Sequence, residues 1–240
     1  MAENTGRNFD LLTLGQLLLR LSPPDNERLS RGDTFIKQVG GAELNVAVGA
    51  ALLGLHTGVI SKLPSHDVGS FIKGKIRSFG VSDDFFMYDH SSSARVGIYY
   101  YENGAYPRKP KVIYDRNNSS FFSLNIDEIP EEVYRASKCF HTTGITLALS
   151  PQVRDTAIEM IKRFKEAGTL VSFDVNFRGN LWTGEEAREC IEKILPYVDI
   201  FFCSEDTARL TFKKTGTARE MMKSFTEEYP ISIVDSTQAS

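Results

Sequence analysis

Residues 170–204 read LVSFDVNFRGNLWTGEEARECIEKILPYVDIFFCS, and this stretch decides the fold class. The run at 170–176 is short and apolar, as is typical of a buried strand. Thr183 and Glu186 have the spacing of a capping box, which predicts a helix from there through Leu195. A second apolar strand is expected at 199–204. Strand, helix and strand at this spacing indicate two parallel strands joined by a helical crossover.

The same alternation continues on both sides of this stretch. Apolar runs bounded by caps and glycines predict the elements, as when Ser150 precedes Pro151 at the start of a helix. The expected elements are a strand at 139–144, a helix at 151–168, a helix at 204–212, a helix capped by Thr217 and Glu220, and a strand at 231–234. Repeated alternation predicts an α/β protein with a mostly parallel sheet, covered by helices on both faces.

The N-terminal third adds further elements of the same kind. We expect strands at 9–14 and 58–63 and a helix at 68–79 that ends before Gly80. Residues 43–53 are apolar on almost every side, which predicts a helix buried all round.

One segment breaks the alternation. VGIYYY at 96–101 and KVIYD at 111–115 are rich in Val, Ile and Tyr, and the Gly- and Pro-containing turn between them predicts a hairpin. Together with the extended segments of about 16–39, the region at 95–116 is expected to form a small β insert outside the main sheet. Residues 1–240 are therefore read as one α/β domain that carries this insert.

Composition excludes several classes of protein. The chain has 240 residues, of which 41% are hydrophobic and 25% charged, so neither a disordered nor a fibrous protein is indicated. Lys and Arg number 28 against 31 Asp and Glu, and this balance predicts no binding to nucleic acid. No apolar run is long enough to cross a membrane and no secretory signal precedes residue 10, so we expect a cytoplasmic protein.

The C-terminal end is unusual for such a sheet. The expected strand at 231–234 is followed only by the polar residues DSTQAS, and the exposed edge of a last strand normally needs cover. The prediction is an incomplete C-terminus, with structure missing after this strand.

Two common nucleotide-binding motifs are not present. No G-x-G-x-x-G follows the first strand, which argues against a dinucleotide-binding dehydrogenase. Gly69 to Ile76 is one residue short of a P-loop, because Ile76 stands where a hydroxyl would bind Mg²⁺, and the segment is predicted to be helical.

The turn at residues 40–45 is a first candidate binding site. Gly40 and Gly41 precede an apolar helix and would let backbone N–H groups approach a ligand closely. Asn45 is the single amide on that helix. The alternative is a tight turn in which backbone groups satisfy Asn45, and local chemistry does not decide between the two.

Polar residues also follow two of the central strands. Asp174, Asn176 and Arg178 alternate along an extended chain, so they are expected to share one side, at the sheet edge where open α/β sheets bind ligands. A carboxylate, an amide and a guanidinium suit a polyol with an anionic group, and the alternative is an Asp–Arg pair that fixes a loop.

The residues Ser204, Glu205 and Asp206 follow the next strand in the same way. Acidic side chains there would hold Mg²⁺ through water, or would only enrich the first turn of a helix.

These features together resemble the ribokinase/PfkB family of carbohydrate kinases, over about residues 8 to 234. The resemblance rests on GGAELNVA at 40–47, the β insert that ends in Tyr114-Asp115-Arg116, and FDVNFR at 173–178. Within the family the insert and FDVNFRGNLW look most like the 2-keto-3-deoxygluconate (KDG) kinases. The implied fold is a ribokinase-like three-layer α/β/α sandwich with a small β lid.

The resemblance also implies a reaction and a site. The reaction is phosphoryl transfer from ATP, with Mg²⁺, to a hydroxyl of a sugar acid such as KDG. The implied residues are Gly40, Gly41, Asn45, Tyr99, Tyr114, Arg116 and Arg178 for the sugar, Asn176 and Ser204 near the phosphates, and Glu205 for the metal. The lid would close over the sugar and pair with a second subunit, so a homodimer is expected.

The sequence also departs from the family pattern. Gln16 replaces a glutamate after the first strand, Pro64 stands where a glycine ends the first signature, and Ser204 replaces the asparagine of the Asn-x-x-Glu motif. The Gly-Ala-Gly-Asp segment, which supplies the anion hole and the catalytic base of the family, does not occur in this chain.

Three functions therefore stay open. The first is a kinase for a sugar acid. The second is a non-catalytic protein that binds a sugar acid and lacks the base. The third is a kinase for a neutral sugar such as fructose or ribose, against which Arg116 and Arg178 argue, because a neutral polyol leaves a buried guanidinium without a partner.

Overall fold

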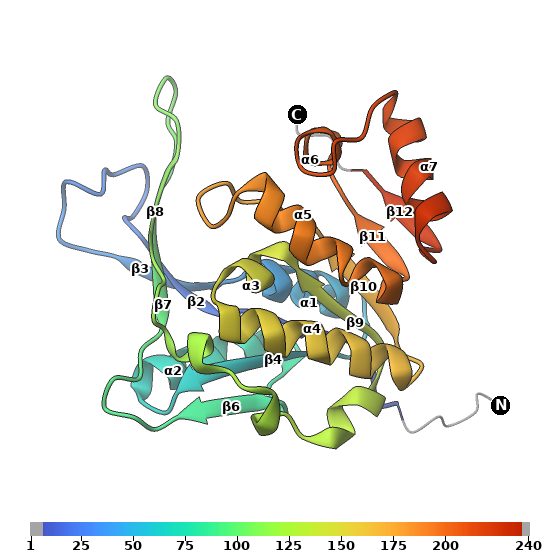
Figure 1. Cartoon of the computed structure of the whole chain (residues 1–240). Coiled ribbons are helices and arrows are strands. Elements are labelled where there is room, and N and C mark those ends of the chain that lie inside the picture. The colour runs from blue at the N-terminus through green and yellow to red at the C-terminus, as the bar shows by residue number, and fades with distance from the viewer. Residues whose placement is uncertain (1–6, 237–240) are drawn as a thin grey trace.

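The computed structural model describes residues 7–236, and its main feature is an eight-stranded sheet (Figure 1). The strand order is β12-β11-β10-β9-β1-β4-β5, with β6 also paired to β4, and all of these pairs are parallel. The strands are β1 (Phe9–Leu14), β4 (Thr57–Pro64), β5 (Val81–Ser82), β6 (Phe86–Asp89), β9 (Ser137–Thr143), β10 (Leu170–Asp174), β11 (Ile200–Phe202) and β12 (Ile233–Asp235). The prediction of a mostly parallel sheet is confirmed.

A second, four-stranded sheet stands apart from the first and extends to the left in Figure 1. Its order is β3-β2-β7-β8, in which β2 and β7 are parallel and the outer pairs antiparallel. The strands are β2 (Leu18–Ser22), β3 (Ile36–Gly40), β7 (Gly97–Glu102) and β8 (Lys111–Asp115). The predicted hairpin is β7 and β8, and the extended segments before residue 40 supply the other two strands.

Seven α-helices are found in the described residues: α1 (Ala42–Leu52), α2 (Asp67–Ser78), α3 (Gly144–Ala148), α4 (Pro151–Glu166), α5 (Gly184–Glu192), α6 (Glu205–Leu210) and α7 (Ala218–Glu228). The predicted caps are present: Ser150 accepts from the N–H of Val153, and Thr183 and Thr217 each form a complete capping box. No helix in residues 7–236 is long and apolar enough to cross a membrane.

The core lies on both faces of the main sheet. On one face, Phe140, Phe173 and Phe201 are fully buried in one cluster with α4, α5 and α7. On the other face, Val59 of β4 packs in a second cluster with α1 and α2. Helices on both faces give three layers, and α1 and α4 lie behind and in front of the sheet in Figure 1.

The layer that contains α1 covers only part of its face. In one row across the sheet, Val59, Thr13, His141 and Ser172 are buried, whereas the last member of the row, Ile233, is 54% exposed. No helix in residues 7–236 buries the apolar side chains on this face of β10–β12. Cover on both faces was predicted, and it is complete on the α4 side only. Leu170 and Ile233 are exposed on this face and Ile200 and Phe202 are half-buried, and we call these four side chains the bare face.

Helix α1 is not buried all round, and that prediction is wrong. Glu43, Leu44 and Ala47 face the protein, whereas Leu52 and Leu53 are 77% and 84% exposed. The apolar sequence indicated burial, but the described chain offers no element to pack on the outer side of this helix. The composition of a helix shows which side chains can be buried, but it does not show whether a neighbouring element is there to bury them.

The small strands β5 and β6 are not predicted by the sequence pattern. Val81–Ser82 has only two residues and Phe86–Asp89 only four, which is too short for a period of two to be recognised. Both follow α2 and extend the main sheet beyond and beside β4.

Candidate functional site

A cavity of about 540 Å³ lies between the two sheets. Its floor is the carboxyl edge of the main sheet, formed by the residues after β1, the start of α1 and the loop after β10. Its wall is one face of the small sheet, with side chains of β2, β7 and β8. Ligands of open α/β sheets bind at this edge, so the fold itself places a binding site here.

Most of the predicted sugar-site residues meet in this cavity. The predicted sugar-site residues that line it are Gly41, Asn45, Tyr99, Tyr114, Arg116 and Arg178, and Asn176, which was predicted to lie near the phosphates, lines it as well. Gly40 lies beside it, because a Cβ at this position would overlap the Tyr99 hydroxyl. Ser204 and Glu205 are not among the lining residues. Seven residues that were predicted to contact the substrates therefore lie together, although they come from four separate segments of the chain.

The turn before α1 requires glycine. Gly41 has φ 156°, a conformation that other residues rarely adopt, and a Cβ there would lie 2.8 Å from the carbonyl oxygen of Gln16. Gly41 is also the N-cap residue of α1 and has no side chain to cap it. Gly41 and Ala42 line the cavity, so the start of α1 lies at the cavity without a side-chain cap.

Asn45 has an exposed amide. Its backbone N–H donates to the carbonyl of Gly41 over 3.0 Å, and in the described structure its side chain has no hydrogen-bond partner. The alternative in which backbone groups satisfy the amide is therefore not what the structure shows. The amide is available to a ligand at the mouth of the cavity.

A network around Gln16 holds Arg116. The Arg116 Nε donates to Gln16 Oε1 over 2.8 Å, and Gln16 Nε2 donates to Ser119 Oγ over 2.7 Å and to the Arg116 carbonyl over 3.2 Å. Burial lowers the pKa of Arg116, while the charge of Glu43 raises it. The guanidinium still carries its charge at neutral pH, and its terminal nitrogens remain for a planar anion.

Tyrosines form the wall of the cavity. The rings of Tyr99 and Tyr114 lie 5.8 Å apart on paired positions of β7 and β8. Arg20 of β2 lies over the Tyr101 ring at 4.3 Å. Arg20 and Tyr101 were not predicted as site residues. The alternation of side chains along a strand could have identified them. Tyr101 is two residues after Tyr99 on β7, Arg20 pairs with Tyr99, and all three line the cavity.

The loop after β10 reaches the cavity by a different route from the one predicted. The strand ends at Asp174, whose Oδ1 accepts from the N–H of Asn176 over 3.0 Å, and Asn176 has φ 38°. The chain therefore turns instead of staying extended. Asn176 and Arg178 line the cavity, but Asp174 does not, and Arg178 is exposed rather than buried. The expected alternation of the three residues is wrong because the turn interrupts it.

The residues after β11 have local partners. Ser204 Oγ accepts from the N–H of Thr207 over 3.2 Å as the N-cap of α6. The Glu205 carboxylate pairs with Arg209 at 2.7 Å. No group of three or more His, Cys, Asp and Glu side chains is placed to hold a metal ion within residues 7–236. Glu205 and Asp206 lie in the first turn of α6, as the alternative describes, and a magnesium ion held there through water stays a prediction.

The charges that line the cavity are unequal. Three guanidinium groups, those of Arg20, Arg116 and Arg178, face a single carboxyl group, that of Glu43. The other polar lining consists of amides and tyrosine hydroxyls. An anionic ligand with several hydroxyl groups matches this lining, because the guanidinium groups bind the anion and the amides bind hydroxyls in either direction.

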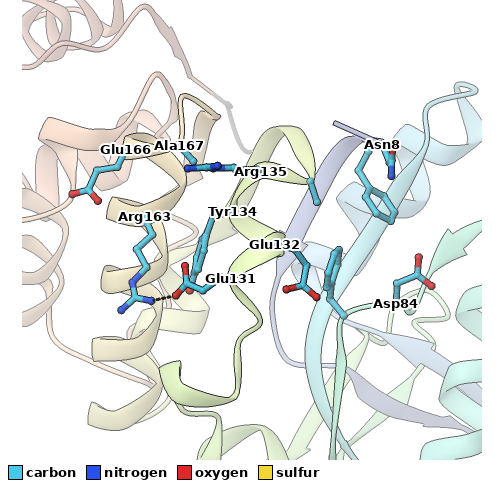
Figure 2. A pocket seen from close by; sticks show the side chains of 12 residues that line it. Asn8, Asp84, Glu131, Glu132, Tyr134, Arg135, Arg163, Glu166 and Ala167 are labelled. Carbon is cyan, nitrogen blue, oxygen red and sulfur yellow. Dashed lines mark hydrogen bonds and ion pairs between the residues drawn. The ribbon is translucent and has the colours of Figure 1, made fainter. Parts of the chain in front are cut away.

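A larger hollow of about 1100 Å³ lies at the opposite edge of the sheet (Figure 2). It lies near the start of β1, and its charged side chains include Glu131, Glu132 and Arg163. Arg163 forms an ion pair with Glu131 at 2.8 Å, and the Glu131 side chain is 80% exposed. Parallel sheets bind ligands at the carboxyl edge, so we place the functional site in the smaller cavity.

The fold and the cavity together define a ribokinase-like protein, in which a parallel sheet and a small lid sheet enclose a site for a small molecule. Comparison with known proteins agrees with this class. The sequence profile of pfkB family carbohydrate kinases matches residues 8–233. The chain belongs to this family, as its sequence motifs predicted.

The similar proteins include kinases of sugar acids and a probable fructokinase of Arabidopsis thaliana, which is 33% identical over 90% of this chain and 62% of its own length. A 2-dehydro-3-deoxygalactonokinase of Haloferax volcanii is 36% identical over 209 residues, which are 87% of this chain and 65% of the relative. The crystal structure of a 2-dehydro-3-deoxygluconokinase from Thermotoga maritima is 31% identical and superposes with a TM-score of 0.88 over 94% of this chain and 72% of that one. A sugar kinase of Pyrococcus horikoshii, solved in complex with ATP, is 26% identical with a TM-score of 0.73, over 85% and 66% of the two chains. The chain thus spans about two thirds of the length of these proteins.

Proposed function

We propose that this chain forms the sugar-binding part of a kinase that transfers the γ-phosphoryl group of ATP to a hydroxyl of a sugar acid such as KDG. The observation that carries the proposal is the lining of the cavity, in which three arginines face one carboxyl group among amides and tyrosines. The sugar acids named for the Haloferax and Thermotoga relatives and the ATP complex of the Pyrococcus protein support the substrates.

Each group in the cavity has a task in this proposal. Arg116, oriented by Gln16, binds the carboxylate of the sugar acid, and Arg178 adds its charge from the exposed side. Asn45 binds sugar hydroxyls, and Asn176, which follows β10, is assigned to the phosphates. Tyr99 and Tyr114 cover the sugar from the small sheet, which excludes water and so strengthens every polar contact inside. Mg²⁺ would neutralise phosphate charge, and Glu205 after β11 is the residue assigned to it.

A second candidate function is binding without catalysis. The sequence contains no Gly-Ala-Gly-Asp segment, which in this family carries the catalytic base and the anion hole. A sugar hydroxyl without a positioned base reacts about 10²–10⁴-fold more slowly. Under this proposal the chain keeps the sugar cavity and lacks the means of phosphoryl transfer.

A kinase for a neutral sugar is the third candidate, and the cavity disfavours it. Fructose or ribose would leave the half-buried Arg116 without an anion. Arg178 does not contribute to this argument as predicted, since it is exposed and solvated without a ligand.

The small sheet has the features of an interface between two chains. Both of its outer strands present apolar side chains to solvent away from the cavity: Phe35 and Ile36 at the β3 side and Ile113 on β8 are each 43% to 47% exposed. We propose that a homodimer covers them, with the two lid sheets in contact. Sedimentation measures the mass of the wild type and of Ile113→Lys in solution. We expect a dimeric wild type and a weaker dimer for the variant, and a monomeric wild type contradicts the proposal.

The function is tested with one sample in two measurements. Calorimetry with KDG, gluconate, fructose and ribose measures binding, and release of ADP at millimolar Mg-ATP measures transfer. Binding of KDG with turnover supports the sugar-acid kinase, and binding without turnover supports the second candidate. A preference for fructose or ribose over KDG contradicts the assignment of a sugar acid.

A further inference from the structure

Resting on the proposed binding of a sugar acid, we propose that Glu43 is a specificity-determining residue. Its buried carboxyl group opposes the charge of Arg116, and its state of charge sets how strongly the cavity prefers an anionic sugar over a neutral one. The sequence pattern did not single out Glu43, because it stands between the glycines and Asn45 of the turn.

Glu43 lies at the junction of three elements. It is in the first turn of α1, it is 2% exposed, and it lines the cavity. Its Oε1 accepts from the hydroxyl of Thr143 over 2.7 Å and from that of Thr146 over 2.8 Å. On the other side the carboxyl group packs against Gly15, where a Cβ would overlap Oε2 and would lie 2.8 Å from the Cβ of Glu43. The group is therefore fixed in place and cannot turn away when a ligand enters.

Glu43 carries the single carboxyl group that lines the cavity within residues 7–236. The charges of Glu43 and Arg116 act on each other, yet the two side chains form no ion pair within 4.0 Å in the described structure. Arg116 instead donates to Gln16 and leaves its terminal nitrogens free of Glu43. A ligand carboxylate that binds Arg116 would consequently meet the field of a second, immobile carboxyl group.

The charge of Glu43 depends on pH. Burial raises its pKa above the usual range, while Thr143, Thr146 and the charge of Arg116 lower it. The titratable and charged groups that share the cavity with it include Arg116 after β8, Arg20 of β2, Tyr99 of β7 and Arg178 after β10. Gln16 and Gly15 after β1 carry no charge. An ionised Glu43 repels a bound anion, and a protonated one does not.

Glu43→Gln tests the inference, because glutamine keeps the shape and the acceptor oxygen for the two threonines and loses the charge. Calorimetry on the full chain would measure the affinity for KDG and for fructose from pH 5 to pH 8.5. We expect the wild type to bind KDG less tightly as the pH rises, and the variant to keep its affinity, so that the variant binds about tenfold more tightly at the upper end. The affinity for fructose should be the same in both proteins.

Asp174→Asn is the matched control. Burial also raises the pKa of Asp174, and Asp174 pairs in register with Thr143, but it does not line the cavity. We expect this variant to keep the pH dependence of KDG binding. The inference is wrong if Glu43→Gln changes the affinities for KDG and fructose by the same factor, or if Asp174→Asn and not Glu43→Gln removes the pH dependence.

The outcomes separate this inference from the proposed function. If the wild type binds neither sugar, the proposed function fails. Unfolding in urea then tests, without any ligand, whether the charge of Glu43 changes with pH. A carboxyl group whose pKa is raised by folding contributes stability below its unfolded pKa and loses it as the pH rises through its folded pKa. The wild type should therefore lose stability relative to Glu43→Gln between pH 4.5 and pH 8.5, and a difference that does not vary with pH overturns the inference.

Discussion

Arg116 and Arg178 differ in burial, and their effects on binding should differ accordingly. Arg116 is half-buried and oriented by Gln16, whereas Arg178 is exposed. A buried charge-assisted contact contributes about 1.5–3 kcal/mol and an exposed ion pair about 0–1 kcal/mol. We therefore expect Arg116→Ala to weaken KDG binding by about 10- to 100-fold and Arg178→Ala by no more than about fivefold, measured by calorimetry.

Fructose is the control ligand for both variants. Its affinity should change less than about threefold, because it has no carboxylate for either guanidinium group. Arg116→Lys should restore part of the KDG affinity, since it keeps the charge and loses the planar fork. Equal losses for KDG and fructose would show that Arg116 supports the cavity rather than recognises the anion.

Gly15 should not tolerate a side chain. A Cβ at this position would overlap the Glu43 carboxyl group, which Thr143 and Thr146 hold in place. We expect Gly15→Ala to lower the free energy of unfolding by about 1–3 kcal/mol. Gly74→Ala is the control, because a Cβ there meets nothing within 4 Å in the middle of α2, and it should gain about 0.4–1 kcal/mol. Thermal unfolding of both variants measures this, and a neutral Gly15→Ala would show that Glu43 can move.

His141 makes the stability depend on pH. It is buried under α1, its Nδ1 lies 2.9 Å from Ser172 Oγ, and burial lowers its pKa to about 4. A histidine with a depressed pKa contributes stability above its unfolded pKa of about 6.5 that is lost as the pH falls toward 4. Between pH 7 and pH 4.5 the wild type should lose about 2–3 kcal/mol more than His141→Asn.

Urea unfolding of both proteins at the two pH values measures this difference. Glu43 and Asp174, whose pKa values burial raises, change stability in the opposite direction, but they are present in both proteins and cancel. Equal losses in wild type and variant would mean that His141 is not the responsible group.

Local chemistry singled out some of the residues that line the cavity and missed others. Gly41 and Asn45 were recognisable because two glycines and one amide stand out before an apolar helix. Glu43 and Gln16 were not, since their roles come from contacts with Thr143, Thr146 and Arg116, about 100 residues away in the chain. Such contacts have no periodicity that a single sequence shows.

At the scale of elements, the prediction was most accurate where a cap or a period marks the chain. The helices that start at Pro151, Gly184 and Ala218 begin where their caps predicted. The strand at 170–176 was predicted two residues too long, because Asn176 adopts a positive φ and turns the chain. Asn176 was the available signal, because asparagine is depleted in strands and tolerates a positive φ, but the prediction treated it as the end of the strand.

Ser204 allows a test of whether α6 has more than a structural role. As an N-cap its replacement should cost about 1 kcal/mol. Thr217→Ala at the N-cap of α7 is the matched control and should cost about the same. We expect Ser204→Ala and Thr217→Ala to lower the melting temperature alike and to leave KDG affinity unchanged. A nucleotide affinity that falls only in Ser204→Ala would instead support the prediction that Ser204 lies near the phosphates.

On the scale of the whole molecule, the layer that contains α1 is incomplete and the layer that contains α4 is not. The relatives are longer than this chain, which spans 65% of the Haloferax protein and 72% of the Thermotoga one. The sequence predicted an uncovered edge at β12 from the polar residues that follow it. It did not predict that a whole sheet face would be uncovered, because cover by another segment is a property of the assembled fold.

The bare face should dominate the solution behaviour of the 240-residue chain. Leu170 and Ile233 are 51% and 54% exposed on neighbouring parts of one sheet face, with the half-buried Ile200 and Phe202 beside them. Contiguous apolar surface of this kind binds hydrophobic dyes and promotes association. We expect Leu170→Lys combined with Ile233→Lys to reduce dye fluorescence and to raise solubility, with a change in stability within about 1 kcal/mol because both side chains are already solvated.

Leu52→Lys is the control for this last prediction. Leu52 is more exposed than either residue, at 77%, but it is on the outer side of α1 rather than on the sheet. This substitution changes a helix surface on which Leu53 is also exposed, and it leaves the bare face of the sheet unchanged. The control should therefore leave dye fluorescence and solubility close to those of the wild type. If instead Leu52→Lys has the larger effect, the outer side of α1 and not the bare face of β10–β12 is the surface through which the chain associates.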